Sequence, residues 1–244
     1  MNPGEIKYWR NSTEIKFVYV DNNQLPLTCI DIWCKAGSTF EEKGKNGSAH
    51  FLEHMIFKGS KKSTPGEFDH KIESLGGSSN AATGHDDVHY YVVVPPSNFE
   101  EALNLLIDLV FNAKISSEEF DKEKKVVLEE IKQQNDDPDD KLFNYFLKRI
   151  WKNNSYGNSI LGNEENIISL KTKDLNNFYQ NNYNSKTICI AIAGDLPKNI
   201  LEIIEKIRIP KIYRKFTKNH KNKQSFKKRT GREEIILDNL QLSR

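Results

Sequence analysis

Several short runs of the chain alternate hydrophobic with polar residues or are rich in β-branched and aromatic side chains. Two such runs cover residues 15–20 and 26–35, and the turn-forming sequence Asp21-Asn22-Asn23 separates them. The pattern predicts a pair of strands joined by a turn. Comparable runs predict further strands at 78–84, 88–95 and 186–193.

Helical spacing, with apolar residues three or four positions apart, characterises much of the remaining sequence. Residues 97–113 show it clearly, and Gly76-Gly77 is a pair of the kind that commonly ends a helix. We expect helices at 48–59, 66–75, 97–113, 117–135, 139–151, 171–180 and 197–207. Strands and helices are mixed without strict alternation, which predicts an α+β fold with a mixed or antiparallel sheet packed against helices.

The most specific chemical signal is the sequence His50-Phe51-Leu52-Glu53-His54. On a helix, positions i and i+4 share one face, so His50 and His54 can present ring nitrogens to one ion, with Glu53 beside them. Neutral imidazoles and a carboxylate suit Zn²⁺, and a carboxylate next to zinc can accept a proton from water. The alternative is two histidines on one helix by coincidence, which so specific a spacing makes rare.

A second predicted helix carries Glu123 and Glu130, seven positions apart and therefore nearly on one face. Glu130 lies at the edge of an apolar stripe formed by Val126, Val127 and Ile131. A half-buried carboxylate needs a counter-charge, and a metal ion is one. Charge-rich helices with glutamates at this spacing are also common, so the residues alone leave open whether Glu130 is a ligand or a surface carboxylate.

Charge is distributed unevenly along the chain. The 244 residues carry a formal net charge of +2, but residues 211–232 contain ten lysines and arginines and no acid. The rest of the chain keeps 26 basic and 34 acidic residues, a net charge of −8. The aromatic residues of the basic segment, Tyr213, Phe216 and Phe226, follow no pattern, and the segment has no nucleic-acid-binding motif. We expect a solvated linker and no nucleic-acid partner.

Several other classes of protein are excluded by composition. No apolar run approaches the ~20 residues of a membrane-spanning helix, and the N-terminal residues lack the apolar core of a secretion signal. We therefore expect a cytoplasmic protein with no membrane partner. The three cysteines, Cys29, Cys34 and Cys189, are odd in number and form no Cys-x-x-Cys pair. They are expected to be small, buried, reduced side chains.

Long stretches of the sequence resemble the pitrilysin-type (M16) zinc metallopeptidases, a family that includes the mitochondrial processing peptidase and insulin-degrading enzyme. The resemblance rests on KAGSTFEEKGKNGSAHFLEHMIFKGS and on GGSSNAATGHDDVHYYVVVP, in which Val88 replaces the family's usual threonine. YGNSILGNEENI and FYQNNYNSKTICIAIAGD resemble later landmarks, so the similarity covers residues 7–207. It implies one homologous half of the family's clam-shell architecture.

The resemblance also implies roles for individual residues. One Zn²⁺ per chain is implied, with three ligands: His50, His54 and Glu130. Glu53 is implied as the general base, and Glu123 as a supporting carboxylate that orients a ligand. Asn80 and Ala81 are implied to lie on an edge strand that binds extended or unfolded peptide substrates by strand addition. The expected reaction is hydrolysis of a peptide bond by water.

Members of this family pair two homologous halves, and the second half usually supplies an Arg-Tyr pair to the substrate. We therefore expect a catalytic domain at 1–210, a basic interdomain linker at 211–232, and the first strand of a truncated second half at 233–244. The expected partner is a second half, in the same full-length chain or in a separate subunit. The sequence leaves open whether the chain is a fragment, one subunit of two, or the product of a truncated gene.

Two alternatives to a zinc-dependent endopeptidase remain from the sequence. The first is a zinc-binding but non-catalytic peptide-binding or regulatory subunit of a two-chain peptidase, because the substrate chamber of one half is incomplete. The second is S-ribosylhomocysteine lyase, which shares the H-x-x-E-H spacing. That enzyme takes its third ligand from a cysteine, and Cys189 has no matching sequence context.

Overall fold

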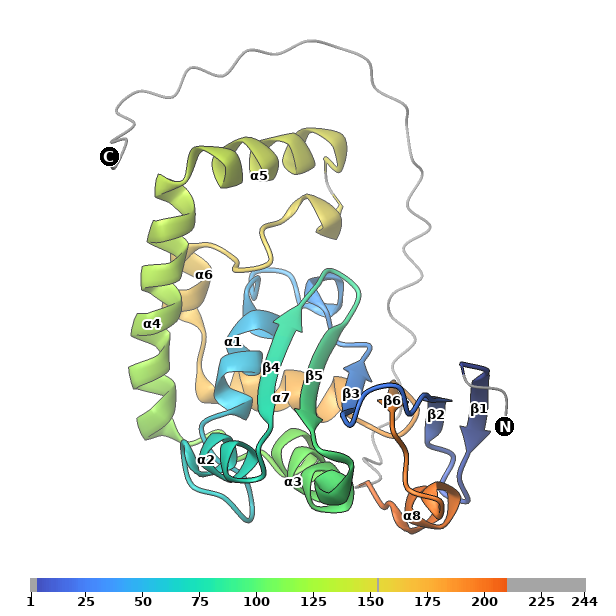
Figure 1. The fold of residues 1–244 in the computed structure, drawn as a ribbon. Helices are drawn as coiled ribbons and strands as arrows, with labels where there is room; N and C mark the ends of the chain where they lie inside the picture. The colour runs from blue at the N-terminus through green and yellow to red at the C-terminus, as the bar shows by residue number, and fades with distance from the viewer. Residues whose placement is uncertain (1–3, 153, 210–244) are drawn as a thin grey trace, which may run out of the picture.

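The computed structural model describes residues 4–152 and 154–209. Its centre is a six-stranded sheet in the order β1-β2-β6-β3-β5-β4 (Figure 1). The strands are β1 (Ile6–Arg10), β2 (Lys16–Asp21), β3 (Thr28–Cys34), β4 (Ser78–Thr83), β5 (Val88–Val94) and β6 (Ile188–Gly194). β2 and β6 pair in parallel and every other neighbouring pair is antiparallel. The predicted α+β fold with a mixed sheet is confirmed.

Helices cover one face of this sheet and a side of the molecule next to β4. The helices are α1 (Ser48–Ile56), α2 (Glu67–Ser74), α3 (Phe99–Phe111), α4 (Ser117–Asp136), α5 (Pro138–Ile150), α6 (Glu164–Ser169), α7 (Thr172–Asn182) and α8 (Ile200–Lys206). Short 3₁₀ turns occupy η1 (Ser38–Phe40), η2 (Pro96–Asn98) and η3 (Ser155–Gly157). None of the helices in the described segments combines the length and apolar character needed to span a membrane.

Alternation along the central strands decides which side chains form the core. In β3, Ile30, Ile32 and Cys34 are fully buried, and in β5 Val88 and Tyr90 lie opposite two of them. Their neighbours on the other face of the sheet are partly exposed, because successive strand residues point to opposite faces. Cys34 is therefore buried as predicted. The same prediction was wrong for Cys29 and Cys189, which are only partly buried.

The structure departs from the predicted elements mainly at two short segments. β1 was not predicted, because nearly all of its residues are exposed and show no alternation of apolar and polar side chains. α6 was not predicted either, because six residues are too few for helical periodicity to be recognised. The predicted linker at 211–232 and the predicted strand at 233–244 lie outside the described residues.

Two apolar faces hold α1 in place. Ala49, Leu52 and Ile56 belong to the main core beneath the sheet. Phe51 and Met55 belong to a second cluster with α4, in which the ring of Phe51 stacks on a phenylalanine of that helix. Burial of two faces leaves the third face of α1 to its polar side chains. Figure 1 shows that the helix itself lies between α4 and β4.

The start of α1 is fixed by a buried carboxylate. Glu41 accepts hydrogen bonds from the backbone N–H groups of Gly47 (3.0 Å) and Ala49 (2.9 Å), two donors at the helix N-terminus that have no partner within the helix. Gly47 has a φ of +92°, and a side chain there would meet the carbonyl oxygen of Leu161 at 2.5 Å. Glycine is therefore required at this position.

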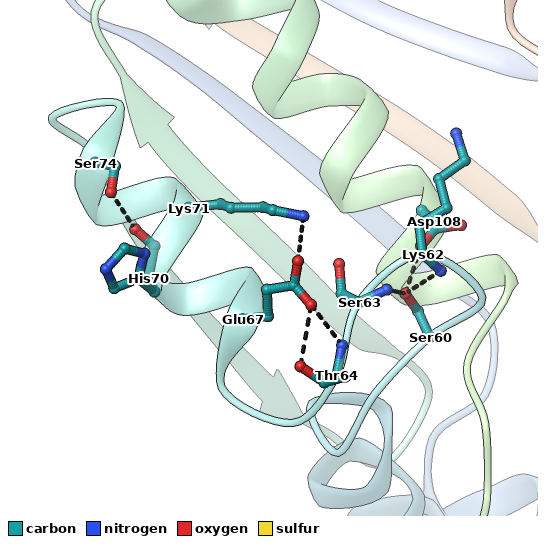
Figure 2. Close-up of polar contacts among 9 residues, drawn as sticks. All are labelled: Ser60, Lys62, Ser63, Thr64, Glu67, His70, Lys71, Ser74 and Asp108. Atoms are coloured by element: carbon teal, nitrogen blue, oxygen red, sulfur yellow. Dashed lines mark hydrogen bonds and ion pairs between the residues drawn. The ribbon is translucent and has the colours of Figure 1, made fainter.

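The segment after α1 is anchored to α3 and α2. The buried carboxylate of Asp108 accepts hydrogen bonds from the hydroxyl of Ser60 and from the backbone N–H of Lys62 (3.1 Å), as Figure 2 shows. Thr64 donates its N–H to Glu67 at 2.9 Å, which closes the turn into α2. These contacts fix both ends of α1, so the polar face of that helix has a defined position.

Candidate metal centre

Three side chains predicted from the sequence converge between α1 and α4. The Nε2 atoms of His50 and His54 are 3.3 Å apart. Glu130 places Oε2 at 3.7 Å from Nε2 of His50 and at 3.5 Å from Nε2 of His54. Among the residues described, this is the group of histidine, cysteine and carboxylate side chains close enough together to hold a metal ion.

The separations of these atoms fit zinc. A tetrahedral ion with bonds of 2.0–2.1 Å holds neighbouring ligand atoms about 3.3 Å apart, close to the three distances observed. Burial, with a smaller effect from the charge of His54, lowers the pKa of His50 to about 3, so this ring is neutral and offers a lone pair. Nδ1 of His50 is buried and has no hydrogen-bond partner among the described residues. Two nitrogens and a carboxylate oxygen converging in this way fit a divalent cation.

Glu123 holds the second imidazole in a fixed orientation. It is buried, its Oε1 lies 2.9 Å from Nδ1 of His54, and its Oε2 lies 2.8 Å from Nζ of Lys58. A proton on Nδ1 leaves the lone pair of His54 on Nε2, the atom that faces His50 and Glu130. Sequence reasoning missed Lys58, although its position four residues after His54 places it on the same face of the chain segment.

Glu53 lies beside this group and is oriented by an edge strand. The hydroxyl of Thr83, the last residue of β4, donates a hydrogen bond to Oε2 of Glu53. Burial raises the pKa of Glu53, while the Thr83 hydroxyl and then the charge of His54 oppose the increase. Sequence reasoning did not identify Thr83, because nothing local indicates that residue 83 meets residue 53.

Asn80 and Ala81 lie on β4, the terminal strand of the sheet, next to α1. The side chain of Asn80 is exposed and its Oδ1 accepts a hydrogen bond from the backbone N–H of Ala81 at 2.9 Å. Ala81 points into the core side of the sheet. Within the described residues no strand pairs with the outer edge of β4, so its backbone is available to an extended peptide.

The other histidines near this stretch are not part of the group. His85 contacts the hydroxyl of Ser38 at 2.9 Å through Nδ1. His89 contacts Asp31 on the opposite face of the sheet.

Val126, which was expected in the buried stripe of α4, is 45% exposed, whereas Val127 and Ile131 are buried as predicted. The stripe that supports Glu130 is therefore narrower than the sequence indicated.

The sequence of the chain is similar to those of known peptidases. The sequence profile of the insulinase family, peptidase family M16, matches residues 16–164. A Rickettsia bellii protein named as an uncharacterized zinc protease is 33% identical over 212 residues, which cover 87% of this chain and 50% of that protein. The beta subunit of the Homo sapiens mitochondrial-processing peptidase is 34% identical over 174 residues, which cover 71% of this chain and 36% of the subunit.

A solved structure shows the same fold. The crystal structure of a protease from Helicobacter pylori superposes with a TM-score of 0.78 at 26% sequence identity, covering 86% of this chain and 54% of that protein. The chain spans about half of the Rickettsia relative and about a third of the human subunit. A profile match across most of the described domain, together with the fold, establishes the relationship: the chain belongs to the insulinase family of peptidases, family M16.

Proposed function

We propose that this chain is the catalytic half of a zinc-dependent endopeptidase that hydrolyses extended or unfolded peptides. The observation that carries the proposal is the convergence of His50, His54 and Glu130 at the separations of zinc ligands, with the carboxylate of Glu53 beside them. The family membership and the names of relatives described as zinc proteases support it. The one such set of donors among the described residues supports one Zn²⁺ per chain.

The proposed chemistry divides between the ion and the protein. Zinc held by the three ligands supplies a Lewis acid that lowers the pKa of water and stabilises negative charge on a peptide carbonyl oxygen. Glu53 accepts a proton from the attacking water and delivers it to the amide nitrogen as the carbon–nitrogen bond breaks. Thr83 holds this carboxylate in place, and Glu123 keeps His54 in the tautomer that binds metal.

The preference for extended peptides is proposed from the position of β4. A peptide that adds to a free sheet edge uses its own backbone hydrogen bonds, so the peptide must be extended and unfolded there. Asn80 and Ala81 are proposed to contact that backbone, because they lie in the middle of the edge strand near Glu53. The exposed amide of Asn80 is free to exchange its present contact for one with substrate.

We further propose that full activity requires a second homologous half. The chain spans half or less of the length of the two relatives described, and the human relative is named as one subunit of an enzyme. The second half would belong to the same full-length chain or to a separate subunit. Under this proposal residues 1–210 are the catalytic domain, 211–232 the linker, and 233–244 the start of the second half.

Cleavage of a quenched, unstructured peptide tests the proposal. The purified chain, alone and mixed with a homologous second half, should cleave the peptide, and a chelator should abolish the cleavage. Glu53→Gln should reduce turnover at least a thousandfold while the zinc content stays at one ion per chain. A chain that holds one zinc but cleaves nothing in either preparation would instead be a non-catalytic peptide-binding subunit.

A further inference from the structure

The turn that joins β4 to β5, residues 84–87, is held against the loop before α1. The backbone N–H groups of Ser38 and Thr39 in η1 donate to two carbonyl oxygens of the turn, at 3.1 Å and 2.8 Å. A side chain at Gly37 would meet the carbonyl oxygen of His85 at 2.4 Å, so the two backbones are in direct contact. The backbone of the turn is therefore tied to the segment that leads into α1.

A second contact holds the turn through a side chain of η3. The hydroxyl of Tyr156 donates a hydrogen bond to Oδ1 of Asp86 at 2.6 Å, while the hydroxyl of Thr39 lies 3.5 Å from the same oxygen. The ring of Tyr156 also contacts the rings of His85 and Trp151, with centroid distances of 5.4 Å and 5.1 Å. Because Trp151 caps the C-terminus of α5, Tyr156 joins the turn to the end of that helix.

The turn begins directly after Thr83, whose hydroxyl contacts the proposed catalytic carboxylate. Within the described residues, this hydroxyl is the one hydrogen-bond partner of the Glu53 side chain. Thr83 is the last residue of β4 and pairs with Val88, the first residue of β5. It lies three positions before Asp86, so a shift of the turn reaches Thr83 through a short stretch of backbone.

The contact between Thr83 and Glu53 is sensitive to small movements of the turn. A hydrogen bond weakens steeply when its geometry leaves the favoured range, and a general base has to lie within reach of the proton that it accepts. Backbone motion concentrates at loop tips unless contacts tie them down. The contacts of Tyr156 therefore restrain the part of the hairpin that would otherwise move most.

We propose that Tyr156 is a positioning residue for the proposed hydrolysis. Its hydroxyl, bonded to Asp86, fixes the turn and thereby keeps Thr83 on the carboxylate of Glu53. Tyr156 is not one of the three side chains of the candidate metal centre, and it acts only through the turn. This inference rests on the proposed function for the role of Glu53, whereas the restraint on the turn can be measured without it.

A double-mutant cycle tests whether Tyr156 acts through Thr83. Tyr156→Phe keeps the ring and removes the hydroxyl. It should lower kcat for the quenched peptide about three- to tenfold, while KM and zinc affinity stay unchanged. In a Thr83→Val background the same substitution should have no further effect, because the hydroxyl that the turn positions is already gone. Equal losses in the two backgrounds would show a general structural role and overturn the proposal.

Matched variants test the hydrogen bond itself. Asp86→Asn keeps an acceptor oxygen for Tyr156 and should retain the kcat of the unmodified protein, whereas Asp86→Ala should behave like Tyr156→Phe. Tyr8→Phe is the control, because it removes a hydroxyl from β1 at the opposite edge of the sheet. It should leave kcat unchanged. An unchanged kcat in Asp86→Ala would contradict the proposed role of the bond.

Hydrogen exchange of backbone amides measures the restraint without catalysis. Tyr156→Phe should speed exchange about three- to tenfold at Gly84, whose N–H donates to the carbonyl oxygen of Asp87 at 2.7 Å. Exchange at Ile32, on a central strand, should not change. Unchanged exchange at Gly84 would overturn the proposal even if the chain cleaves the peptide. Faster exchange in a chain that cleaves nothing would confirm the restraint and refute the catalytic role of Glu53 that it serves.

Discussion

At the scale of single residues, the buried carboxylate of Glu123 contacts two side chains at the candidate metal centre and would not itself touch the proposed ion. Its two oxygens hold His54 and Lys58 at 2.9 Å and 2.8 Å. This one carboxylate thus fixes the tautomer of the His54 imidazole and pairs with the ammonium group of Lys58, just after α1. Removing either contact leaves a buried polar group without its partner.

Glu123→Gln is expected to weaken zinc binding about 10- to 100-fold, because the amide holds His54 less firmly and leaves Lys58 without a counter-charge. Competition with a zinc-binding dye measures this change. The matched control is Glu129→Gln on the same helix, where an exposed carboxylate pairs with Lys132 and contacts no ligand. Equal zinc affinities of the two variants would show that Glu123 does not position His54.

Glu41 is expected to make stability depend on pH. Burial raises its pKa from 4.5 to about 8, against the opposing effect of the hydrogen bonds from Ala49 and Gly47. Between pH ~4.5 and ~8 the folded state therefore binds more protons at this site than the unfolded state, so stability falls as pH rises through this range.

The loss of folding stability due to Glu41 is a few kcal/mol at most. Glu41→Gln should make the free energy of unfolding depend less on pH, because glutamine accepts the same hydrogen bonds without titrating. Urea unfolding of both proteins at pH 5, 6.5 and 8 with a chelator present measures it. Parallel curves for the two proteins would rule out Glu41 as the titrating group.

The residues of the site differ in how far the sequence predicts them. His50, Glu53 and His54 are set by spacing on one helix, so the local pattern was sufficient. Spacing alone left open whether Glu130 is a ligand or a surface carboxylate, because nearby residues do not specify which helix packs against its own. Thr83 and Lys58 act through contacts formed only in the folded chain. Their hydroxyl and ammonium groups look like ordinary surface chemistry in the sequence.

At the scale of elements, the site depends on how α1 is started and buried. Gly47→Ala should destabilise the protein by about 3 kcal/mol or more, because a φ of +92° is strained for alanine and its Cβ would meet Leu161. Gly44→Ala is the matched control, since its φ of +80° is similar but open space surrounds it. It should cost only about 1 kcal/mol. Chemical unfolding compares the two, and equal losses would mean that backbone strain alone requires the glycine.

Most elements followed from hydrophobic periodicity, and the exceptions have physical reasons. Runs rich in β-branched and aromatic residues predicted β3 and β5 at nearly their observed positions, and burial alternates along both strands. β1 lacks an alternating pattern because it lies at the sheet edge with both faces largely exposed. α5 was predicted correctly as a helix although none of its residues is buried. Its apolar residues are spaced as in a buried helix, yet four of them lie exposed in the described chain: Leu142, Phe143, Tyr145 and Phe146.

At the scale of the whole molecule, bound zinc would tie α1 to α4 and so add to global stability. Zinc at 100 times its dissociation constant should stabilise the folded chain by about 2.7 kcal/mol, if the unfolded chain binds it weakly. The melting temperature should therefore fall on chelation and recover when zinc is restored. Glu53→Gln keeps the three ligands and should show the same shift. His50→Ala should show little shift, and a full shift in that variant would place the zinc elsewhere.

The sheet topology was the part of the whole molecule that local patterns did not determine. The α+β class and a mixed sheet were predicted, but the strand order was not. Each strand's pattern shows which side chains are buried and carries no information on which strand lies next to it. The insertion of β6 between β2 and β3 is decided by packing of residues far apart in sequence.

That insertion has a consequence for a chain emerging from the ribosome. Until residues 188–194 are made, β1 and β2 have no bond to the sheet formed by β3, β5 and β4. The donors of the metal centre are complete once Glu130 has been added. Translation at 5–20 residues per second leaves roughly 3 to 13 s between that residue and the end of β6. During this interval the nascent chain carries all three proposed ligands on a half-assembled sheet, so under the proposed function metal capture can begin before the fold is closed.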